Sequence, residues 1–138
     1  TAPLGVDALV DRYLAAYVAG DLATLTASLA EGAVFEDPSM RLLGRDAIGD
    51  GLARVFDDLV MESFDEDRRL RSGARHVLVD GRVRVHHSGA AYGYDGRLHF
   101  DVELAVVLDV FEGRIHRHTD LVDSSAYAEQ LREQLGAR

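Results

Sequence analysis

The hydrophobic period of this chain changes once, and that change constrains the possible folds more than any other feature. Over the first 60 residues, apolar side chains recur at spacings of three and four, which is typical of amphipathic helices. From residue 76 onward, apolar and polar residues alternate, which is typical of strands with one buried face. Helices followed by a run of strands predict a segregated α+β fold rather than the parallel sheet of βαβ repeats.

The helical part divides into three amphipathic segments. The spacing of apolar residues predicts a helix over residues 6–17, a short helix over 22–29 and a third helix over 48–59. Gly20 suits the position just beyond the first helix, where a left-handed backbone is common, and Asp21 can cap the second helix.

Two segments outside the helices predict short or marginal strands. Residues 34–37 form a short strand that ends at Pro38, because proline has no N–H to donate to a sheet. The acidic segment at residues 62–67 is interpreted as a solvated loop or strand edge, with Glu62 near the mouth of any pocket.

The alternating part predicts a meander of strands. The pair Asp80-Gly81 is a hairpin signal, and it predicts separate strands over His76–Val79 and Arg82–His87. A long strand follows over Leu98–Val110, and a turn leads from it into a last strand over Arg114–Val122. After these strands, Asp123, Ser124 and Ser125 can cap a C-terminal helix that carries Tyr127 and Leu131.

Side-chain parity on the long strand predicts which face is buried. Its even positions are apolar and its odd positions include acids, so the even face should point inward. The even residues are Val102, Leu104, Val106 and Leu108, and the acids are Asp101, Glu103 and Asp109. A sheet of this length must curve around the helices, and we therefore expect a cone-shaped, curved antiparallel sheet with a central pocket.

Composition excludes several classes of protein. The 138 residues are 47% hydrophobic and 28% charged, which predicts one globular domain over residues 1–138. The absence of cysteine excludes disulfides and thiolate chemistry. A net charge of −9, with arginines interleaved among acids, argues against nucleic-acid binding. No apolar run approaches the roughly 18 residues of a membrane span, and we expect a cytoplasmic protein whose first residues were trimmed.

Several segments share their order and spacing with known proteins. They are Arg12-Tyr13-Leu14, Gly20-Asp21-Leu22, Phe35-Glu36-Asp37-Pro38 and Gly44-Arg45-Asp46-Ala47-Ile48. Together they resemble the first half of ketosteroid isomerases. The last segment, Gly113 to Asp123, resembles the closing strand of limonene epoxide hydrolases and SnoaL-like cyclases. These proteins belong to the nuclear transport factor 2-like superfamily, and the resemblance implies its cone fold, which hosts many reactions and also non-enzymes.

The ketosteroid isomerase resemblance implies two catalytic residues. Asp37 matches the general base of that family, and Tyr13 matches its oxyanion-hole tyrosine. The second oxyanion donor, a protonated aspartate, aligns with Leu104, so that half of the oxyanion hole is missing.

The epoxide hydrolase resemblance implies a different but overlapping set. Arg84 and Asp120 match the arginine and one aspartate of the catalytic group, while the other aspartate is His86 here. The asparagine and tyrosine that help hold the water align with Asp37 and Phe35.

Strand parity, together with these resemblances, predicts six polar side chains in one apolar pocket. They are Tyr13, Asp37, Arg84, His86, His118 and Asp120. We expect Asp37 to transfer a proton, Tyr13 to donate to the oxygen that gains charge, and His118 with Asp120 to form a second acid–base pair. The expected apolar wall consists of Leu14, Phe35, Val55, Phe56, Val102, Leu104 and Val122. No glycine-rich phosphate loop follows a strand, so no cofactor is expected.

Structural interpretations of the same residues remain open. Asp37 before Pro38 is able to cap a turn through the local backbone. Tyr13 is able to act as plain core, and Arg84 with Asp120 can form a structural ion pair. Alternating strand positions put His116 and His118 on one face, and with Asp120 they offer ligands to zinc or iron, although no metal is our main expectation.

Three functions therefore remain under consideration. The first is a cofactor-independent isomerase, dehydratase or cyclase acting on a steroid-, terpenoid- or polyketide-like molecule. The second is an epoxide hydrolase, and the third is a non-catalytic binding or assembly domain. The expected partners are a small hydrophobic substrate and a second copy of the chain, paired through the outer sheet face, where Arg82 or Arg97 would answer the acids.

Overall fold

The structure, a computed structural model, describes residues 5–136. The helices are α1 (Val6–Ala19), α2 (Leu22–Ala27), α3 (Arg45–Phe56) and α4 (Ser124–Gly136), with a short 3-10 turn η1 (Ala90–Tyr92). The strands are β1 (Leu29–Glu36), β2 (Arg41–Leu43), β3 (Val60–Ser72), β4 (His76–Ser88), β5 (Arg97–Phe111) and β6 (Arg114–Val122). No helix in this part of the chain is long and apolar enough to cross a membrane.

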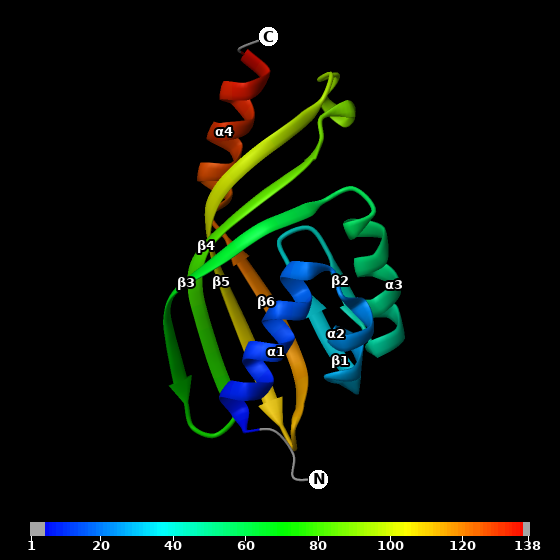
Figure 1. Ribbon diagram of the computed structural model, residues 1–138, viewed down its shortest axis with the longest axis vertical. Helices are drawn as coiled ribbons and strands as arrows, with labels where there is room; N and C mark the ends of the chain where they lie inside the picture. The colour runs from blue at the N-terminus through cyan, green and yellow to red at the C-terminus, as the bar shows by residue number, and fades with distance from the viewer. Residues whose placement is uncertain (1–4, 137–138) are drawn as a thin grey trace.

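The strands form one curved sheet in the order β2-β1-β6-β5-β4-β3. Figure 1 shows α1 lying across the sheet, with α3 beside β1 and β2. The expected curved α+β cone is confirmed, with one correction to the pairing. The strands β3 to β6 and the pair β1–β2 are antiparallel, but β1 runs parallel to β6. The connection from β1 to β6 spans most of the chain, so a parallel pairing between them could not be read from local alternation.

The parity of the long strand is as expected. Val102, Leu104, Val106 and Leu108 are all at most 5% exposed. On the outer face, the guanidinium Nε of Arg82 lies 3.0 Å from the carboxylate of Asp101, and that of Arg75 lies 3.0 Å from Asp109. Arginine side chains therefore form ion pairs with the acids on this face, as anticipated for Arg82.

The hairpin expected at Asp80-Gly81 is wrong, because β4 runs through both residues without a turn. Its partner β3 has a bulge between Glu66 and Arg68, opposite Gly81. A Cβ atom on Gly81 would lie 2.2 Å from the backbone oxygen of Asp65. Glycine is needed here because a neighbouring backbone approaches closely, and not because the chain reverses. The reversal occurs instead at Gly73, which has a φ of 64°.

Three strands differ in extent from the expectation: β3 and β1 are longer, and β2 was not expected. The acidic segment at 62–67 belongs to β3, a 13-residue strand at the sheet edge, which agrees with the strand-edge interpretation. The strand expected at 34–37 begins at Leu29, and it is followed by the unexpected strand β2. A tight turn joins them, closed by the Asp37 N–H donating to the Met40 carbonyl at 3.0 Å.

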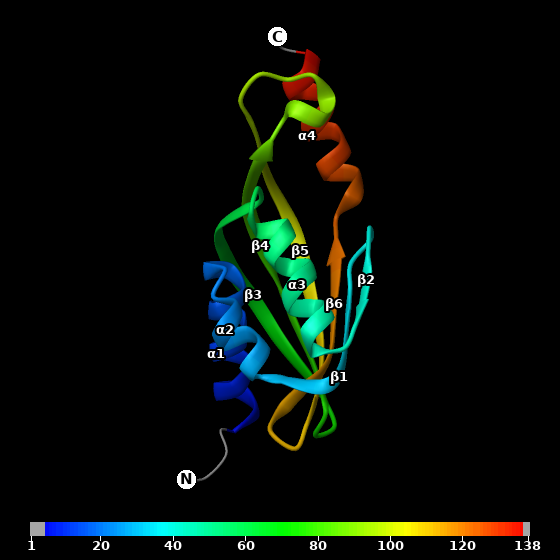
Figure 2. The same ribbon diagram turned by 90° about the vertical axis from the view of Figure 1, so that its right-hand side faces the viewer.

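The C-terminal helix covers an edge of β5 beyond the end of β6. Asp123 caps α4 by accepting from the Ala126 N–H at 3.1 Å. The side-chain amide of Gln130 bonds the N–H and carbonyl of Asp101, and that of Gln134 bonds those of His99, at 2.8 to 2.9 Å. Four residues along a helix and two residues along a strand both span about 6 Å. The two glutamine amides can therefore take the place of the backbone partners that a neighbouring strand would supply to β5. Figure 2 shows α4 standing beside this part of the sheet.

Candidate active site

A cavity of about 340 Å³ lies between the inner sheet face, α3, the start of α4 and the turn after β1. Its wall is mostly apolar, and five of the seven expected wall residues are present. These are Val55, Phe56, Val102, Leu104 and Val122. Further apolar wall residues not anticipated from the sequence are Pro38, Met40, Leu52, Leu59, Met61, Val83 and Val85. The polar wall residues are Tyr17, Asp37, Ser39, Asp120, Ser124 and Tyr127.

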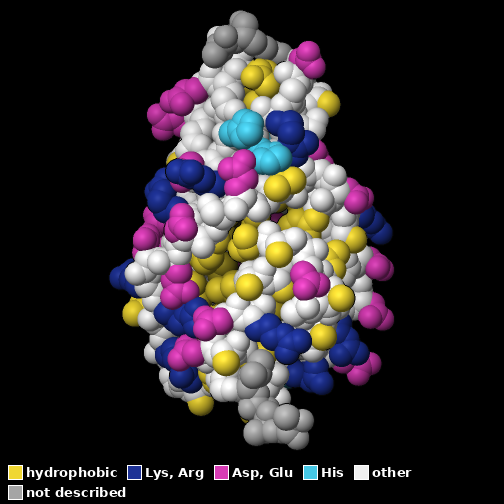
Figure 3. Space-filling model, in the orientation of Figure 1, with side chains coloured by type: hydrophobic (Ala, Val, Ile, Leu, Met, Phe, Trp, Pro, Cys, Tyr) yellow, Lys and Arg dark blue, Asp and Glu magenta, His cyan; other side chains and the backbone are white. Residues whose placement is uncertain are grey.

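Leu14 and Phe35 do not line this cavity. Leu14 lines a separate groove between α1 and β3, on the face where Figure 3 shows hydrophobic side chains in a central hollow. Phe35 is fully buried, with its ring centroid 4.5 Å from that of His118 and 6.1 Å from that of Tyr17. Phe35 is therefore a packing residue behind the wall, and its side chain supports the polar groups instead of touching a ligand.

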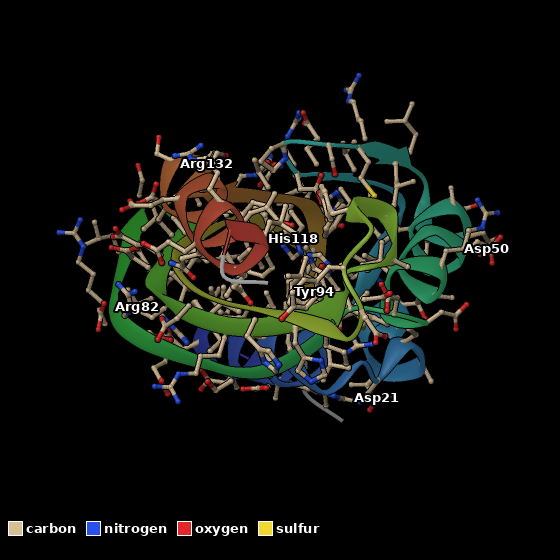
Figure 4. The ribbon with its side chains drawn as sticks, turned by 90° about the horizontal axis from the view of Figure 1, so that it is seen from above. Asp21, Asp50, Arg82, Tyr94, His118 and Arg132 are labelled. Atoms are coloured by element: carbon tan, nitrogen blue, oxygen red, sulfur yellow. The ribbon has the colours of Figure 1, made fainter. Side chains whose placement is uncertain are left out.

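A chain of buried hydrogen bonds leads to Asp120. The Tyr13 hydroxyl lies 2.7 Å from Nδ1 of His118, and Nε2 of His118 lies 2.6 Å from Oδ1 of Asp120. The Tyr17 hydroxyl donates to Oδ2 of Asp120 at 2.5 Å. Asp120 is 6% exposed and lies on the cavity wall, whereas His118 is fully buried behind it. Figure 4 shows His118 enclosed by the surrounding elements.

The direction of these hydrogen bonds follows from the available partners. Burial, and then the charge of Asp120, raise the pKa of Tyr13 well above 10, so Tyr13 keeps its proton. That proton has Nδ1 of His118 as its acceptor, which leaves Nε2 to carry the imidazole N–H toward Asp120. Nε2 of His118 and the phenol of Tyr17 therefore each donate to one oxygen of the carboxylate.

The spacing of α1 matches the spacing of β6. Tyr13 and Tyr17 are four residues apart on a helix, which places their side chains about 6 Å apart on one face. His118 and Asp120 are two residues apart on a strand, which gives nearly the same separation. Sequence reasoning placed Tyr17 in the core and missed its role, although the paired spacings contain the signal.

Tyr13 does not point into the cavity, contrary to the expectation that it serves as an oxyanion donor. It is 0% exposed, and its hydroxyl is used by His118. The tyrosine that reaches the wall is Tyr17, one turn further along α1. Burial raises the pKa of Tyr17 well above 10, and the charges of Asp120 and, more weakly, Asp37 raise it further.

Asp37 lies at the rim of the same cavity and closes the turn after β1. Its Oδ1 accepts from the Ser39 N–H at 2.8 Å, the Ser39 hydroxyl at 2.9 Å and the Met40 N–H at 2.8 Å. This is the turn-capping arrangement that was left open as the structural interpretation. Asp37 is therefore both a cap and a second carboxylate on the cavity wall.

Arg84 and His86 point away from the cavity, which corrects two of the six expected site residues. On β4 the apolar residues Val83 and Val85 occupy the inner face, and strand alternation sends their neighbours outward. Arg84 is paired with Asp101, with Nε 3.4 Å from its carboxylate. The ion pair between Arg84 and Asp120, which was one structural interpretation of these residues, is absent from the described residues.

His86 belongs to a surface cluster. Nε of Arg97 donates to Nδ1 of His86 at 2.6 Å, and the rings of His86 and His99 are 5.3 Å apart. Figure 3 shows histidine side chains gathered on the upper part of this face, beside charged groups. The inner histidine of β4 is His87, whose Nε2 lies 2.8 Å from the Tyr127 hydroxyl.

His116, one of the three residues considered as ligands of a metal ion, does not face the other two. A bulge in the β5–β6 pairing, between Asp109 and Val110, breaks the alternation of β6. His116 is therefore directed away from His118, and its Nε2 lies 3.2 Å from the Phe111 carbonyl. Across residues 5–136, no group of three or more histidine or acidic side chains is arranged to hold a metal ion.

The curved sheet and its cavity agree with the fold that the resemblance to the nuclear transport factor 2-like superfamily implies. More narrowly, the SnoaL-like domain family matches residues 10–118, and the chain belongs to this family. No curated protein sequence matches the chain.

Solved structures share the fold at low identity. A candidate SnoaL-like polyketide cyclase from Shewanella putrefaciens is 22% identical, with a TM-score of 0.82 over 93% of this chain and 96% of that one. A limonene epoxide hydrolase-like enzyme from Mycobacterium tuberculosis is 22% identical, with a TM-score of 0.74 over 94% and 90%. A Catenulispora acidiphila protein with a ketosteroid isomerase-like fold, solved with trimethylamine, is 21% identical, with a TM-score of 0.70 over 88% and 90%.

Proposed function

We propose that this protein is a cofactor-independent acid–base enzyme of the isomerase or cyclase type, acting on a small, largely apolar molecule. The observation that carries the proposal is the position of Asp120. It lies in the wall of an apolar cavity, with one side-chain donor behind each carboxylate oxygen. Membership of the SnoaL-like family supports the reaction class.

The proposed step is proton removal from a carbon of the substrate. The C–H bond breaks, an O–H bond forms on Asp120, and the electron pair stays on the substrate. His118 and Tyr17 occupy one lone pair on each oxygen and hold the carboxylate in one orientation, which leaves lone pairs that are free to face the cavity. Asp120 then returns the proton to a second atom, which completes an isomerisation or follows a ring closure.

The arrangement is less suited to the two alternative functions. The epoxide-hydrolase mechanism implied by the resemblance needs an arginine beside the aspartate, and Arg84 lies on the outer sheet face. A purely structural network would pair its members only with one another. Tyr13 and His118 fit that description, but Asp120 and Tyr17 also line the cavity.

Hydrogen–deuterium exchange tests the proposal without knowledge of the product. The protein is incubated in D2O with a panel of small apolar ketones, enones and their amine and iminium analogues, and deuterium uptake at carbon is followed by mass spectrometry. We expect catalysed exchange into at least one class, lost in Asp120→Asn. The matched control is Asp37→Asn, which makes the same change in the same cavity and should retain most of the exchange.

Equal exchange rates in the parent and in Asp120→Asn would contradict the proposal, because Asp120 would then not be the proton acceptor. Loss of deuterium exchange in Asp37→Asn alone would show that Asp37 is the base, as the ketosteroid isomerase resemblance implies.

We also propose that two copies pair through the outer sheet face. Leu121 on β6 and Leu43 on β2 are 55% and 60% exposed there, and the acid Asp101 is already balanced by Arg82 and Arg84. Sedimentation should give a dimer that Leu121→Glu converts to a monomer. A monomer at high concentration for the parent would exclude this pairing.

A further inference from the structure

The cavity contains two carboxylates and no basic side chain among its described wall residues. Asp120 lies deep in the wall and Asp37 lies at the rim, and arginine and histidine are both missing from the lining. The nearest histidines are behind the wall, where His118 donates to Asp120 and His87 contacts Tyr127. Since a cleft lined by charges of one sign concentrates ligands of the opposite sign, this lining favours positively charged ligands.

Neither carboxylate is paired with an arginine in the part of the chain that the structure describes. The donors to Asp37 are two backbone N–H groups and one hydroxyl. The donors to Asp120 are the phenol of Tyr17 and Nε2 of His118, whose other ring nitrogen contacts the Tyr13 hydroxyl. Backbone, hydroxyl and phenol donors satisfy oxygen lone pairs, but they leave the negative potential of a carboxylate in the cavity.

Aromatic rings add to this preference. Tyr17, Phe56 and Tyr127 all contribute to the wall, and the ring centroids of Tyr17 and Phe56 are 5.9 Å apart. The face of an aromatic ring attracts a cation, most strongly where water is excluded. The combination of carboxylates and rings without a basic residue is suited to an alkylated ammonium or iminium group.

The same groups disfavour a developing negative charge. An enolate needs donors aimed at its oxygen, but the hydroxyls of Tyr17, Ser39 and Ser124 already donate to Asp120, Asp37 and the Val122 carbonyl, respectively. Proton transfer from a cationic substrate to Asp120 instead removes two opposite charges and leaves a neutral product. In an apolar cavity, proton transfer from a cationic substrate therefore costs less free energy than the formation of an enolate.

We infer that the substrate of this site carries a positive charge at its reacting end, as an amine-derived ammonium or iminium group on an apolar body. This inference rests on the proposed function for the identity of the site, and it adds the charge of the substrate. Proton removal beside an iminium carbon would place the electron pair in an enamine, with the proton on Asp120.

Three para-substituted phenols of similar size test the inference by binding alone. They are (4-hydroxyphenyl)trimethylammonium, its uncharged isostere 4-tert-butylphenol, and the anion 4-hydroxybenzenesulfonate. In calorimetric titrations at low salt, we expect the cation to bind at least about tenfold more tightly than the isostere. The anion should show no binding at millimolar concentration.

Variants locate the effect in the cavity. Asp120→Asn and Asp37→Asn should each weaken binding of the cation by about three- to tenfold, while binding of 4-tert-butylphenol, which also reports folding, stays unchanged. The control is Asp50→Asn, which makes the same change in net charge on the exposed side of α3, where Figure 4 shows Asp50 pointing away from the centre.

Three results would overturn the inference: equal binding of the two isosteres, tighter binding of the neutral one, or no binding of the cation at millimolar concentration. These results are independent of turnover. If the cation binds as expected but Asp120→Asn retains full deuterium exchange, the proposed function fails and the preference for cations stands. If exchange requires Asp120 but the isosteres bind equally, the proposed function stands and the preference for cations fails.

Discussion

Asp120 and Asp37 are two carboxylates on one cavity, but they are held in different ways. Asp120 is held by side chains from the core, on both of its oxygens. Asp37 is held on Oδ1 alone, by groups of its own turn at positions 39 and 40. The first arrangement needs the whole fold, and the second needs only four consecutive residues.

This difference predicts different roles. A side chain held by a local turn stabilises that turn, whether or not a ligand is bound. A buried carboxylate costs desolvation free energy, and a protein that only needed a stable core would fill the position with an apolar residue. The buried site is therefore the better candidate for chemistry, although the resemblance to ketosteroid isomerases points to the turn.

The largest effect should come from Asp120→Asn. Loss of a general base typically lowers the rate by about 10² to 10⁴, or roughly 3 to 5 kcal/mol of barrier. We expect that loss in the deuterium-exchange rate, with binding of a neutral ligand retained. Asp37→Asn should lower the rate by less than about tenfold. If the two variants are affected in the reverse order, the comparison between the two carboxylates is wrong.

Removal of the imidazole should give the next largest effect. His118→Leu leaves one oxygen of Asp120 buried without its donor and removes the acceptor of the Tyr13 hydroxyl. We expect a loss of about 3 kcal/mol in the free energy of unfolding, measured by urea denaturation. Tyr13→Phe should cost less, about 1 kcal/mol, because only one neutral donor is removed.

These two losses should be linked. In the background of Asp120→Leu, the charge is gone, and His118→Leu should then cost clearly less than it does in the parent. Additive costs would show that the imidazole stabilises the core by packing, and not by its hydrogen bond to the carboxylate.

The turn at the rim should respond to truncation more than to loss of charge. Asp37→Ala removes the acceptor of three hydrogen bonds and should lower the free energy of unfolding by about 1 to 2 kcal/mol. Asp37→Asn keeps an amide oxygen as acceptor and should lose less than about 1 kcal/mol. Equal losses in denaturation midpoints would mean that the charge, and not the turn, is what Asp37 contributes.

The smallest effect should appear at high pH. The pKa of Tyr13 and that of Tyr17 are raised above 10 in the folded protein. Because the folded values are the higher ones, the stabilisation is complete below pH 10 and is lost as the pH rises through the folded values. The free energy of unfolding should therefore fall above pH 10, and less steeply in Tyr17→Phe.

The titration of Tyr17 also compares the two carboxylates directly. Absorbance at 295 nm should show that Asp120→Asn lowers the pKa of Tyr17 more than Asp37→Asn does, since Asp120 acts through both its charge and a hydrogen bond, whereas Asp37 acts through its charge alone. Equal shifts would show that both carboxylates are equally close to the phenol.

The amino-acid sequence by itself determined the class of fold and most of its elements. The change from helical to alternating period predicted the α+β arrangement, and the parity of residues 101–109 predicted the inner face of β5. These predictions succeed because burial of apolar side chains acts on every residue and repeats with the period of the element. Residues 123–125 were likewise identified as candidate caps from their position, and Asp123 is the one that caps α4, since capping needs only the next few residues.

The site was decided by contacts that local patterns do not contain. Asp80-Gly81 has the composition of a turn, but the bulge of β3 that receives Gly81 is 15 residues away in sequence. Strand parity, together with the resemblance, predicted Arg84 and His86 on the inner face. The structure gives that face to the alternating residues Val83 and Val85, because an unpaired inner arginine costs more free energy than an outer one.

Only the tertiary structure could show which tyrosine meets which member of β6. The rotation of α1 over the sheet places Tyr13 against His118 and Tyr17 against Asp120. That rotation is set by the packing of the whole helix face, which includes Leu9 and Val10, and not by the polar residues themselves. A hydrogen-bond chain between residues more than 100 positions apart therefore depends on an apolar core that the sequence predicts only as a stripe on one helix.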